Sequence, residues 1–310
     1  MLIGIDLGGT NIAAGLVTNE GELLFKRSLP TNAHRPAEEL IKDIYLLIDE
    51  LRNSTDRPIE AVGIGIPGLV NKDMSVVLAC ANLHWSHVRL MDGLKNLNLP
   101  IAIDNDANVA AYAEYKIGSL KGVSNGIMVT LGTGVGSGII IDDREVRGGH
   151  GIGTELGHMI IGDNFYDCNC GSNGCLETFA SATAIIKYAE HRIETTELPS
   201  KLRDLEKITA KDVIDLSKEN DVIAIETFER FIKYLARGIV NIQLILDPER
   251  IALGGGVSGA GDYLLNRLTK EVDKQYFLSE FSSTEIVISE LGNDAGIIGA
   301  ALLAKDHCVN

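Results

Sequence analysis

The sequence lacks several features that would place it in a common functional class. Lysine and arginine number 28 against 43 aspartate and glutamate residues, which gives a formal net charge of −15. Because non-specific binding to nucleic acid or to anionic membranes needs clustered Lys and Arg, we expect neither partner. No apolar run is long enough to span a bilayer, and the chain begins with a strand-like apolar run. We therefore expect no signal peptide and a cytoplasmic location.

Two familiar nucleotide-binding signatures are also missing. The pattern G-x-x-x-x-G-K-[ST] of P-loop enzymes does not occur, and we predict no helix that is opened by G-x-G-x-x-G. A P-loop enzyme is therefore excluded, and a dinucleotide-binding fold is disfavoured. The sequence contains no low-complexity or Pro/Ser-rich linker, so any domain boundary is crossed by ordinary chain.

Three of the five cysteines lie in one short segment, Glu155–Glu177. His158, Cys168, Cys170 and Cys175 offer three thiolates and one imidazole, which complete the tetrahedral shell of a closed structural Zn²⁺ site. Disulfides or three buried free thiols are the alternatives. A disulfide between Cys168 and Cys170 would be strained, and nothing in the sequence indicates an oxidising compartment. We therefore predict a zinc site in this segment.

The histidine of this segment has a second ring nitrogen. If one nitrogen binds zinc, the other carries a proton and points its N–H outward at a fixed acceptor. Glu155 and Glu177 flank the four ligands at both ends, and Gly171 and Gly174 allow tight turns between them. The sequence therefore predicts that the metal holds His158, Glu155 and Glu177 towards one spot.

A strand, a glycine-rich turn and a second strand occur twice. The first copy has strands at 2–5 and 12–17, and the second has strands at 127–131 and 138–141. This repetition suggests two related halves. Further predicted strands cover 22–29, 61–66, 100–104, 251–253 and 285–289, and predicted helices cover 36–52, 105–115, 181–192, 211–218, 224–246 and 295–304, with one more starting at 262. Strands that alternate with helices indicate an α/β architecture.

The two glycine-rich turns are candidate phosphate sites. Such turns present backbone N–H groups to phosphate without side chains in the way. Two of them in repeated units, facing each other across a cleft, are stronger support than one. Asp6, at the end of the first strand, is placed to hold Mg²⁺ directly or through water, and Thr10, Asn11 and Thr133 add neutral donors.

Asp106 lies where a predicted strand passes into a helix, the edge of an α/β sheet at which ligands gather. The helix N-terminus stabilises a carboxylate there and lowers its pKa. An ionised Asp106 could accept a proton from an alcohol that attacks a phosphoryl group. A simple helix N-cap explains the same residue equally well, because Asp and Asn are common caps.

Six stretches match one family in the expected order. They are Asp6–Asn11, Gly65–Gly68, Asn82–Trp85, Asp104–Asn108, Leu131–Gly136 and Glu155–Glu177. On these motifs the chain resembles the ROK sugar kinases, and among them the bacterial zinc-containing glucokinases. The resemblance implies a duplicated α/β fold of the actin-like ATPase (ribonuclease H-like) type, with a ligand cleft between two domains. It implies a smaller domain of residues 1–120 plus 297–310 and a larger domain of residues 121–296.

The resemblance also implies an activity: phosphorylation of glucose to glucose 6-phosphate by ATP, with Mg²⁺ and a structural Zn²⁺, as in glycolysis. Asp106 would be the catalytic base, and the sugar would be bound by Gly68, Asn82, Asn105, Asp106, Glu155, His158 and Glu177, with His158 bridging zinc and sugar. The ATP site would comprise Asp6, Gly8, Gly9, Thr10, Asn11, Gly132, Thr133, Gly134 and Gly136, with Gly254, Gly255 and Gly256 beside the adenosine. The family is typically homodimeric or homotetrameric.

Other functions remain open from the sequence. The same carboxylates suit fructose, mannose, N-acetylmannosamine or N-acetylglucosamine, although Asn82–Trp85 looks most like the glucokinases. Polyphosphate is an alternative donor, but the third glycine-rich turn, at Gly254, fits an adenosine site better. The family also includes sugar-responsive repressors, which carry a DNA-binding helix-turn-helix before the first strand. Because this chain starts at that strand and is strongly acidic, we expect neither a non-catalytic sugar sensor nor a zinc-ribbon adaptor.

Overall fold

A five-stranded sheet built on the N-terminal hairpin forms the first half of the fold. The computed structural model describes residues 1–278, 280–281 and 283–309. The sheet has the order β3-β2-β1-β4-β8, with β1 (Leu2–Leu7), β2 (Asn11–Val17), β3 (Leu23–Pro30), β4 (Ala61–Ile66) and β8 (Ile101–Asn105). Its first three strands are antiparallel, whereas β4 runs parallel to both β1 and β8.

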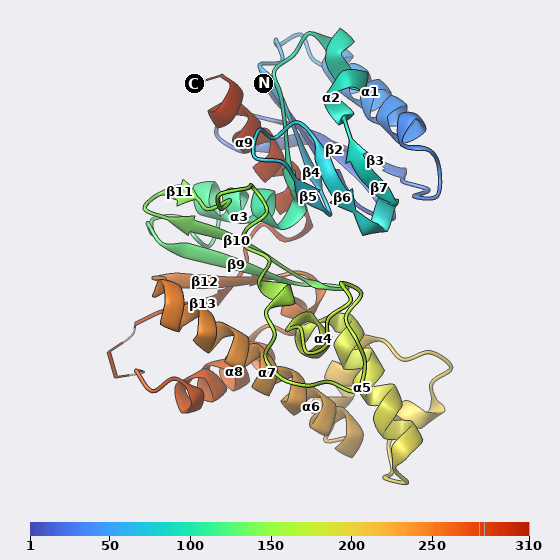
Figure 1. Ribbon diagram of the computed structural model, residues 1–310, viewed down its shortest axis with the longest axis vertical. Coiled ribbons are helices and arrows are strands. Elements are labelled where there is room, and N and C mark those ends of the chain that lie inside the picture. Colours follow the sequence, from blue (N-terminus) through green and yellow to red (C-terminus); the bar gives the residue numbers. More distant parts are fainter. Residues whose placement is uncertain (279, 282, 310) are drawn as a thin grey trace. The chain divides into compact units, whose positions relative to one another are not determined.

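Three helices pack with this sheet: α1 (Ala37–Asn53), α3 (Asp106–Ile117) and α9 (Ala295–Cys308). Helix α1 buries one apolar face that includes Leu40, Ile44 and Leu51. Helix α9, red in Figure 1, packs on β1, β4 and α3. Glycines allow this approach, because a Cβ added to Gly4 would lie 1.8 Å from the carbonyl oxygen of Ile297.

A second five-stranded sheet repeats the arrangement. Its order is β11-β10-β9-β12-β13, with β9 (Gly126–Leu131), β10 (Val135–Ile141), β11 (Arg144–Glu145), β12 (Arg250–Gly254) and β13 (Glu285–Ile288). Strand β10 is antiparallel to β11, as β2 is to β3, and β12 is parallel to β13, as β4 is to β8. The predicted repetition of a strand, a glycine turn and a strand is therefore confirmed in the topology.

The remaining helices follow the second hairpin in the chain. They are α4 (Glu177–Ala180), α5 (Ala182–Thr195), α6 (Ala210–Lys218), α7 (Val222–Leu246) and α8 (Asp262–Gln275). Helix α7 packs against the other four. It starts at Asp221, whose side chain accepts a hydrogen bond from the Ala224 N–H, and it stops at Asp247, which has a left-handed backbone before Pro248. The predicted helices are confirmed here, with small shifts at their ends.

A small three-stranded sheet was not predicted. It consists of β5 (Leu69–Val70), β6 (Val77–Cys80) and β7 (Trp85–Val88), and it is followed by the short helix α2 (Leu90–Leu94). Trp85 is buried in the apolar core as the first residue of β7. Short 3₁₀ turns complete the described secondary structure: Ala81–Leu83, Lys95–Leu97, Leu156–His158, Lys201–Asp204, Gly256–Ala260 and Gly292–Asp294.

The chain packs as two compact units. Unit 1 comprises Met1–Met128, Gly138–Thr154 and Glu290–Asn310, and unit 2 comprises Val129–Ser137 and Glu155–Ser289. The domain bounds expected from the sequence place 121–128, 138–154 and 290–296 in the larger domain, whereas unit 1 contains these residues, and those bounds stay a prediction. Within the described part of the chain, no helix is both long and apolar enough to cross a membrane. The cytoplasmic location stays a prediction.

Candidate functional site

The first glycine turn joins β1 to β2 in unit 1. The Gly8 N–H donates to the Asn11 carbonyl at 2.9 Å, and the Thr31 hydroxyl donates to the Gly8 carbonyl at 2.6 Å. The tip of the turn, Gly9–Asn11, is exposed. A Cβ added to Gly9 would lie 3.5 Å from the Asn82 side chain. The structure therefore places two predicted site residues, Gly9 and Asn82, near each other.

Asp6 precedes this turn at the end of β1. Burial raises the pKa of its carboxyl group, and the charge of Lys26 lowers it by a smaller amount. The carboxylate lies against Gly296 of α9, because a Cβ added there would be 2.8 Å from Asp6 Oδ2. A buried carboxylate whose charge is penalised in this way gains most from a nearby cation, which fits the predicted contact with Mg²⁺.

Asp106 is the first residue of α3, but it is not the N-cap. The cap is Asn105, whose Oδ1 accepts hydrogen bonds from the N–H groups of Ala107 at 2.8 Å and Asn108 at 3.3 Å. Asp106 Oδ1 also accepts from the Ala107 N–H at 2.8 Å. The helix start is therefore capped by Asn105, and the alternative interpretation of Asp106 as a simple N-cap is wrong.

Two predicted sugar residues of unit 1, Asn105 and Gly68, lie together at this helix start. Asn105 Nδ2 donates to the Gly68 carbonyl at 3.2 Å, and Gly68 lies close to the backbone of Ala79 and Cys80. Cys80 is fully buried, as expected of a small hydrophobe, and its thiol donates to the Pro67 carbonyl at 3.2 Å. Burial raises the pKa of this thiol, and the nearby Asp106 charge raises it further.

The second glycine turn joins β9 to β10 in unit 2. Gly132 N–H donates to the Gly134 carbonyl at 3.0 Å, and the Thr183 hydroxyl donates to the Thr133 carbonyl at 2.7 Å. Glu177 Oε2 accepts the Val135 N–H at 3.0 Å, and a Cβ on Gly134 would lie 2.1 Å from the same oxygen. The predicted sugar ligand Glu177 is therefore bonded to the predicted phosphate turn.

The four predicted zinc ligands lie together in unit 2. The ligand atoms of His158, Cys168, Cys170 and Cys175 are all within 4.8 Å of one another. His158 Nδ1 is 3.7 Å from Cys168 Sγ, and Cys170 Sγ is 3.5 Å from Cys175 Sγ. A tetrahedral zinc ion needs ligand atoms about 3.5–3.8 Å apart. The donor set and its spacing therefore fit zinc.

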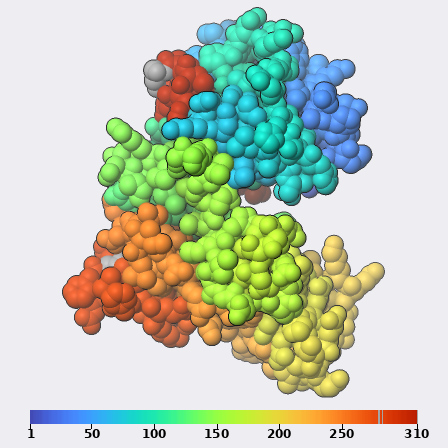
Figure 2. Space-filling view, viewed as in Figure 1, coloured from blue at the N-terminus to red at the C-terminus, as the bar shows by residue number. Residues whose placement is uncertain are grey.

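Backbone hydrogen bonds shape this metal loop, residues 159–176, which appears in yellow-green in Figure 2. Cys168 N–H donates to the Ser172 carbonyl, and Gly171 N–H donates to the Cys168 carbonyl. Gly174 has a φ of 88°, and a Cβ there would collide with the Gly162 carbonyl oxygen at 1.8 Å. A hydrogen bond from the Ser172 backbone lowers the pKa of Cys170 to about 6, which favours the thiolate that a metal binds.

His158 places its Nδ1 on the side of the cysteines, so its Nε2 is the nitrogen available to other partners. Glu155 and His158 share one 3₁₀ turn, in which the His158 N–H donates to the Glu155 carbonyl at 3.0 Å. Although Glu155 is exposed overall, desolvation raises the pKa of its carboxyl group; His158 lowers it and Glu177 raises it. The charges of His158 and Glu177 thus act on Glu155, and a shared role of the three side chains in sugar binding stays a prediction.

The third glycine-rich segment lies beside the second turn. Strand β12 ends at Gly254, and Gly255 has a φ of 81°. A Cβ on Gly255 would be 2.6 Å from the Leu131 carbonyl oxygen, at the end of β9. Residues 254–259 do carry G-x-G-x-x-G spacing, but the 3₁₀ turn Gly256–Ala260 contains the last four of them and α8 begins only at Asp262. The segment is thus placed next to the phosphate turn.

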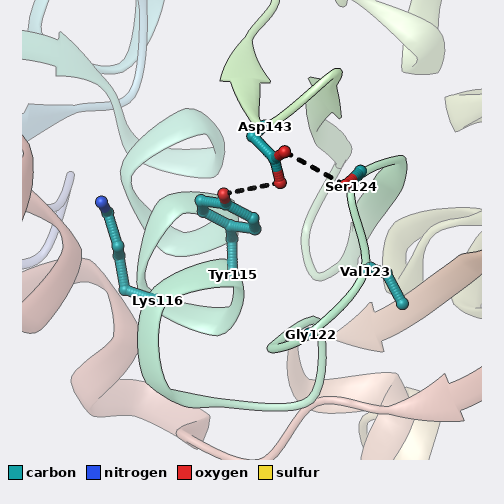
Figure 3. Close-up of a pocket in the computed structure, with 6 residues that line it drawn as sticks. All are labelled: Tyr115, Lys116, Gly122, Val123, Ser124 and Asp143. Atoms are coloured by element: carbon teal, nitrogen blue, oxygen red, sulfur yellow. Dashed lines mark hydrogen bonds between the residues drawn. The ribbon is translucent and has the colours of Figure 1, made fainter.

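A separate pocket of about 290 Å³ lies in unit 1 and contains none of the predicted site residues. Tyr115 Oη and Ser124 Oγ donate to the two oxygens of Asp143 at 3.1 Å each, and Lys116 lies along its rim (Figure 3). These bonds link the end of α3 to the hairpin after β10. The pocket is polar and open, and we assign it no role.

Two residues near Asp106 were not identified from the sequence. Asp104 is buried at the end of β8, and Arg147 follows β11 and forms an ion pair with it. Asp104 belongs to a motif that the sequence displays, but nothing local indicates that a distant arginine pairs with it. The sequence signal that could have identified Asp104 was its position: a carboxylate in a predicted buried strand, directly before a predicted helix start.

Comparison with known proteins gives a consistent result. The family model described as the ROK family matches residues 2–307. A glucokinase of Halalkalibacterium halodurans is 34% identical over 98% of this chain and 95% of its own length. A xylose repressor of Bacillus subtilis is 31% identical over 98% of this chain but 77% of its own length. The crystal structure of a ROK family glucokinase from Streptomyces griseus, in complex with glucose and AMPPNP, has a TM-score of 0.85 and 34% identity, covering 98% of this chain and 99% of that one.

Proposed function

The chain belongs to the ROK family and is a sugar kinase, and we propose that it transfers the γ-phosphoryl group of ATP to glucose. The observation that carries this proposal is the position of Asp106 at the start of α3. Asn105 supplies the helix cap and donates to the Gly68 carbonyl, and these neighbours support a reactive role for Asp106 at the first position of the helix. The full-length similarity to glucokinases supports the choice of glucose.

In the mechanism that we propose, Asp106 accepts the proton of the attacking sugar hydroxyl. Backbone N–H groups of the turns at Gly8–Asn11 and Gly132–Gly136 bind the ATP phosphates, and Gly254–Gly256 border the adenosine. Asp6 would hold Mg²⁺, which offsets the negative charge of the phosphates. The backbone N–H groups and Mg²⁺ would stabilise the negative charge that develops during phosphoryl transfer. Asp106, by accepting the proton, would make the sugar hydroxyl a better nucleophile.

We propose that sugar hydroxyls are bound by six residues: Gly68, Asn82, Asn105, Glu155, His158 and Glu177. Zinc held by His158, Cys168, Cys170 and Cys175 would fix the imidazole and its loop, so that Nε2 donates to a sugar hydroxyl. The metal thus acts on binding, and the chemistry is left to Asp106.

The test is phosphate transfer from Mg–ATP by the purified protein to glucose, fructose, mannose, N-acetylmannosamine and N-acetylglucosamine. We expect glucose to give by far the largest kcat/KM. A larger kcat/KM for another hexose would make that hexose the assigned substrate in place of glucose. The assignment of the protein as a kinase would not change. Polyphosphate offered in place of ATP should support little transfer, because the glycine-rich segment at Gly254 fits an adenosine site.

A sugar-responsive regulator is the second candidate, because xylose repressors match nearly the whole chain. Those relatives are longer than the matched region, which covers 78% and 77% of their lengths. Sugar binding without transfer to any hexose, with zinc bound and Asp106 intact, would favour this candidate. Formation of a homodimer or homotetramer, which the family suggests, stays a prediction for light scattering to test.

A further inference from the structure

Asp104 lies directly beneath the first turn of α3. Its side chain is buried, with 3% exposed, and one oxygen serves two donors. Oδ1 accepts the backbone N–H of Asn105 at 2.7 Å and the Nδ2 of Asn108 at 3.2 Å. Because Asn105 is the helix cap and Asn108 lies in the first turn, this one carboxylate holds the Asn105 backbone and the Asn108 side chain, on the two sides of Asp106.

Arg147 fixes the other oxygen of Asp104. Its guanidinium forms an ion pair with Oδ2, and it is 13% exposed. The same guanidinium lies 3.4 Å from Glu145 of β11 and donates to the Lys72 carbonyl at 3.4 Å. The start of α3 is thereby tied to two other segments of unit 1, the strand β11 and the loop after β5.

A buried ion pair is a poor source of net stability, because the desolvation of two charges offsets most of their attraction. Its value here is geometric. A general base must stay within about 0.5 Å of its productive position, and small misplacements reduce turnover strongly. Asn105 and Asn108 lie on the two sides of Asp106 and are hydrogen-bonded to each other. The carboxylate of Asp104 accepts a hydrogen bond from each of them.

We propose that Asp104 and Arg147 are positioning residues for Asp106, and that their ion pair sets the geometry of the catalytic carboxylate without touching the sugar. This proposal rests on the proposed function, in which Asp106 is the base. It predicts that disturbing the pair lowers kcat while sugar binding stays intact, a split that general loss of stability would not produce.

Asp104→Asn is the principal test, because it preserves shape and removes the charge. Glu145 lies close enough to Arg147 to become its counter-ion, so we expect the variant to fold. We expect kcat to fall about 10- to 100-fold and the calorimetric Kd for glucose to change less than about threefold. Arg147→Lys retains the positive charge but loses the planar guanidinium group. We expect it to lower kcat without changing the Kd for glucose, as Asp104→Asn does, but to a smaller degree.

Asp306→Asn is the matched control. Asp306 of α9 also contacts α3 through an ion pair, with Lys116 at 2.7 Å and a hydrogen bond from Tyr112, but away from Asp106. We expect this variant to keep kcat within about twofold of the parent chain, as surface substitutions usually do. An equal loss of kcat in Asp306→Asn and Asp104→Asn would overturn the proposal.

A second readout does not depend on catalysis. Hydrogen exchange of the Ala107 and Asn108 amides, which bond to Asn105 Oδ1, should accelerate about tenfold or more in Asp104→Asn, with the amides of α9 unchanged. Unchanged exchange, or a kcat within twofold of the parent chain, contradicts the proposal. If the parent chain transfers phosphate to no sugar, the proposed function fails, and the exchange experiment still decides whether Asp104 anchors the helix start.

Discussion

The two glycine turns have the same place in their hairpins but differ in what supports them. The turn of unit 1 is closed by its own backbone and by Thr31, and the neutral side chain of Asn82 lies near Gly9. The turn of unit 2 is bonded to a carboxylate, because Glu177 accepts the Val135 N–H. Glu177 Oε1 also lies 3.8 Å from Cys168 Sγ. Glu177 therefore links the turn of unit 2 to the metal cluster.

The difference assigns separate roles to the two units. Unit 1 carries Asp106 and a turn that Thr31 supports, and unit 2 carries the cluster and a turn that Glu177 connects to it. We therefore expect a change at Asp106 to act on turnover, and changes in the metal loop to act on sugar binding and local stability. The following variants test this division.

Asp106→Asn should have the largest effect. The amide cannot accept the hydroxyl proton, so we expect kcat to fall by about 10²- to 10⁴-fold, while calorimetry still detects sugar binding. Asp143→Asn, in the pocket of the same unit, is a control expected to retain kcat within about twofold. Near-normal turnover of Asp106→Asn would contradict the assignment of Asp106 as the catalytic base. It would also contradict the expectation that this residue of unit 1 controls turnover.

Cys170→Ser should have the next largest effect, and it should act on unit 2. We expect metal affinity to fall at least about 10- to 100-fold and thermal stability to fall with it, because a structural metal contributes to folding. Zinc content after dialysis and the thermal unfolding midpoint measure the two losses. Cys308→Ser, at an exposed thiol of α9, is the control. Full activity of Cys170→Ser without bound zinc would contradict the role of the metal.

A matched pair of glycine substitutions compares the turns directly. In Gly134→Ala the new Cβ would lie 2.1 Å from Glu177 Oε2 and displace it, whereas in Gly9→Ala the nearest atom is Asn82 Cβ at 3.5 Å, an ordinary contact. We expect Gly134→Ala to raise the KM for glucose about tenfold and Gly9→Ala to leave it within about twofold. Equal effects on this KM would show that the two turns are not coupled differently to sugar binding.

Glu145→Gln should have the smallest effect, visible only in the pH dependence of stability. Burial, followed by the charge of Asp104, raises the pKa of Glu145 to about 9 from 4.5, and Arg147 lowers it. His307 and Tyr112 also face this carboxyl. In the unfolded chain the group ionises above its ordinary pKa, so the free energy of unfolding declines as the pH rises between the two values.

Glu145→Gln removes this ionisation. Between pH 6 and pH 8 the parent chain should therefore lose on the order of 1–3 kcal/mol more unfolding free energy than the variant, as measured by urea denaturation. Parallel curves for the two proteins would show that Glu145 is ionised in the folded chain across this range. The buried polar cluster beside Asp104 would then carry an additional charge.

Local patterns were sufficient for most of the fold. The spacing of Leu40, Ile44 and Leu51 predicts the helix that is observed as α1, and the apolar run at 61–66 has the bounds of β4. The three clustered cysteines with His158 predict ligand atoms that the structure places within 4.8 Å of one another. In each case the information lies in neighbouring residues, because helix, strand and short metal loops are local structures.

The features that were missed depend on contacts between distant segments. The strands β5 to β7 are too short to show alternation, and they form only by pairing with one another. The sequence could not distinguish Asn105 from Asp106 as the cap of α3, because both residue types cap helices. The pairing of Asp104 with Arg147 is visible only once β8 and the loop after β11 are brought together.

The close packing of α9 on β1 and β4 also has a consequence for biosynthesis. The Cβ positions of Gly4 and Gly63 would lie 1.8 and 1.7 Å from carbonyl oxygens of α9, so these strands are shaped for that helix. During synthesis on the ribosome, β1 and β4 emerge long before α9. The face of their sheet that α9 covers therefore stays exposed to solvent until that helix is made. Unit 2 can complete its core earlier, because Val129–Ser137 and Glu155–Ser289 all precede α9. We therefore expect chaperones to bind the nascent chain at β1 and β4, which are synthesised first. We also expect unit 2 to complete its folding before unit 1, although unit 1 contains the N-terminus.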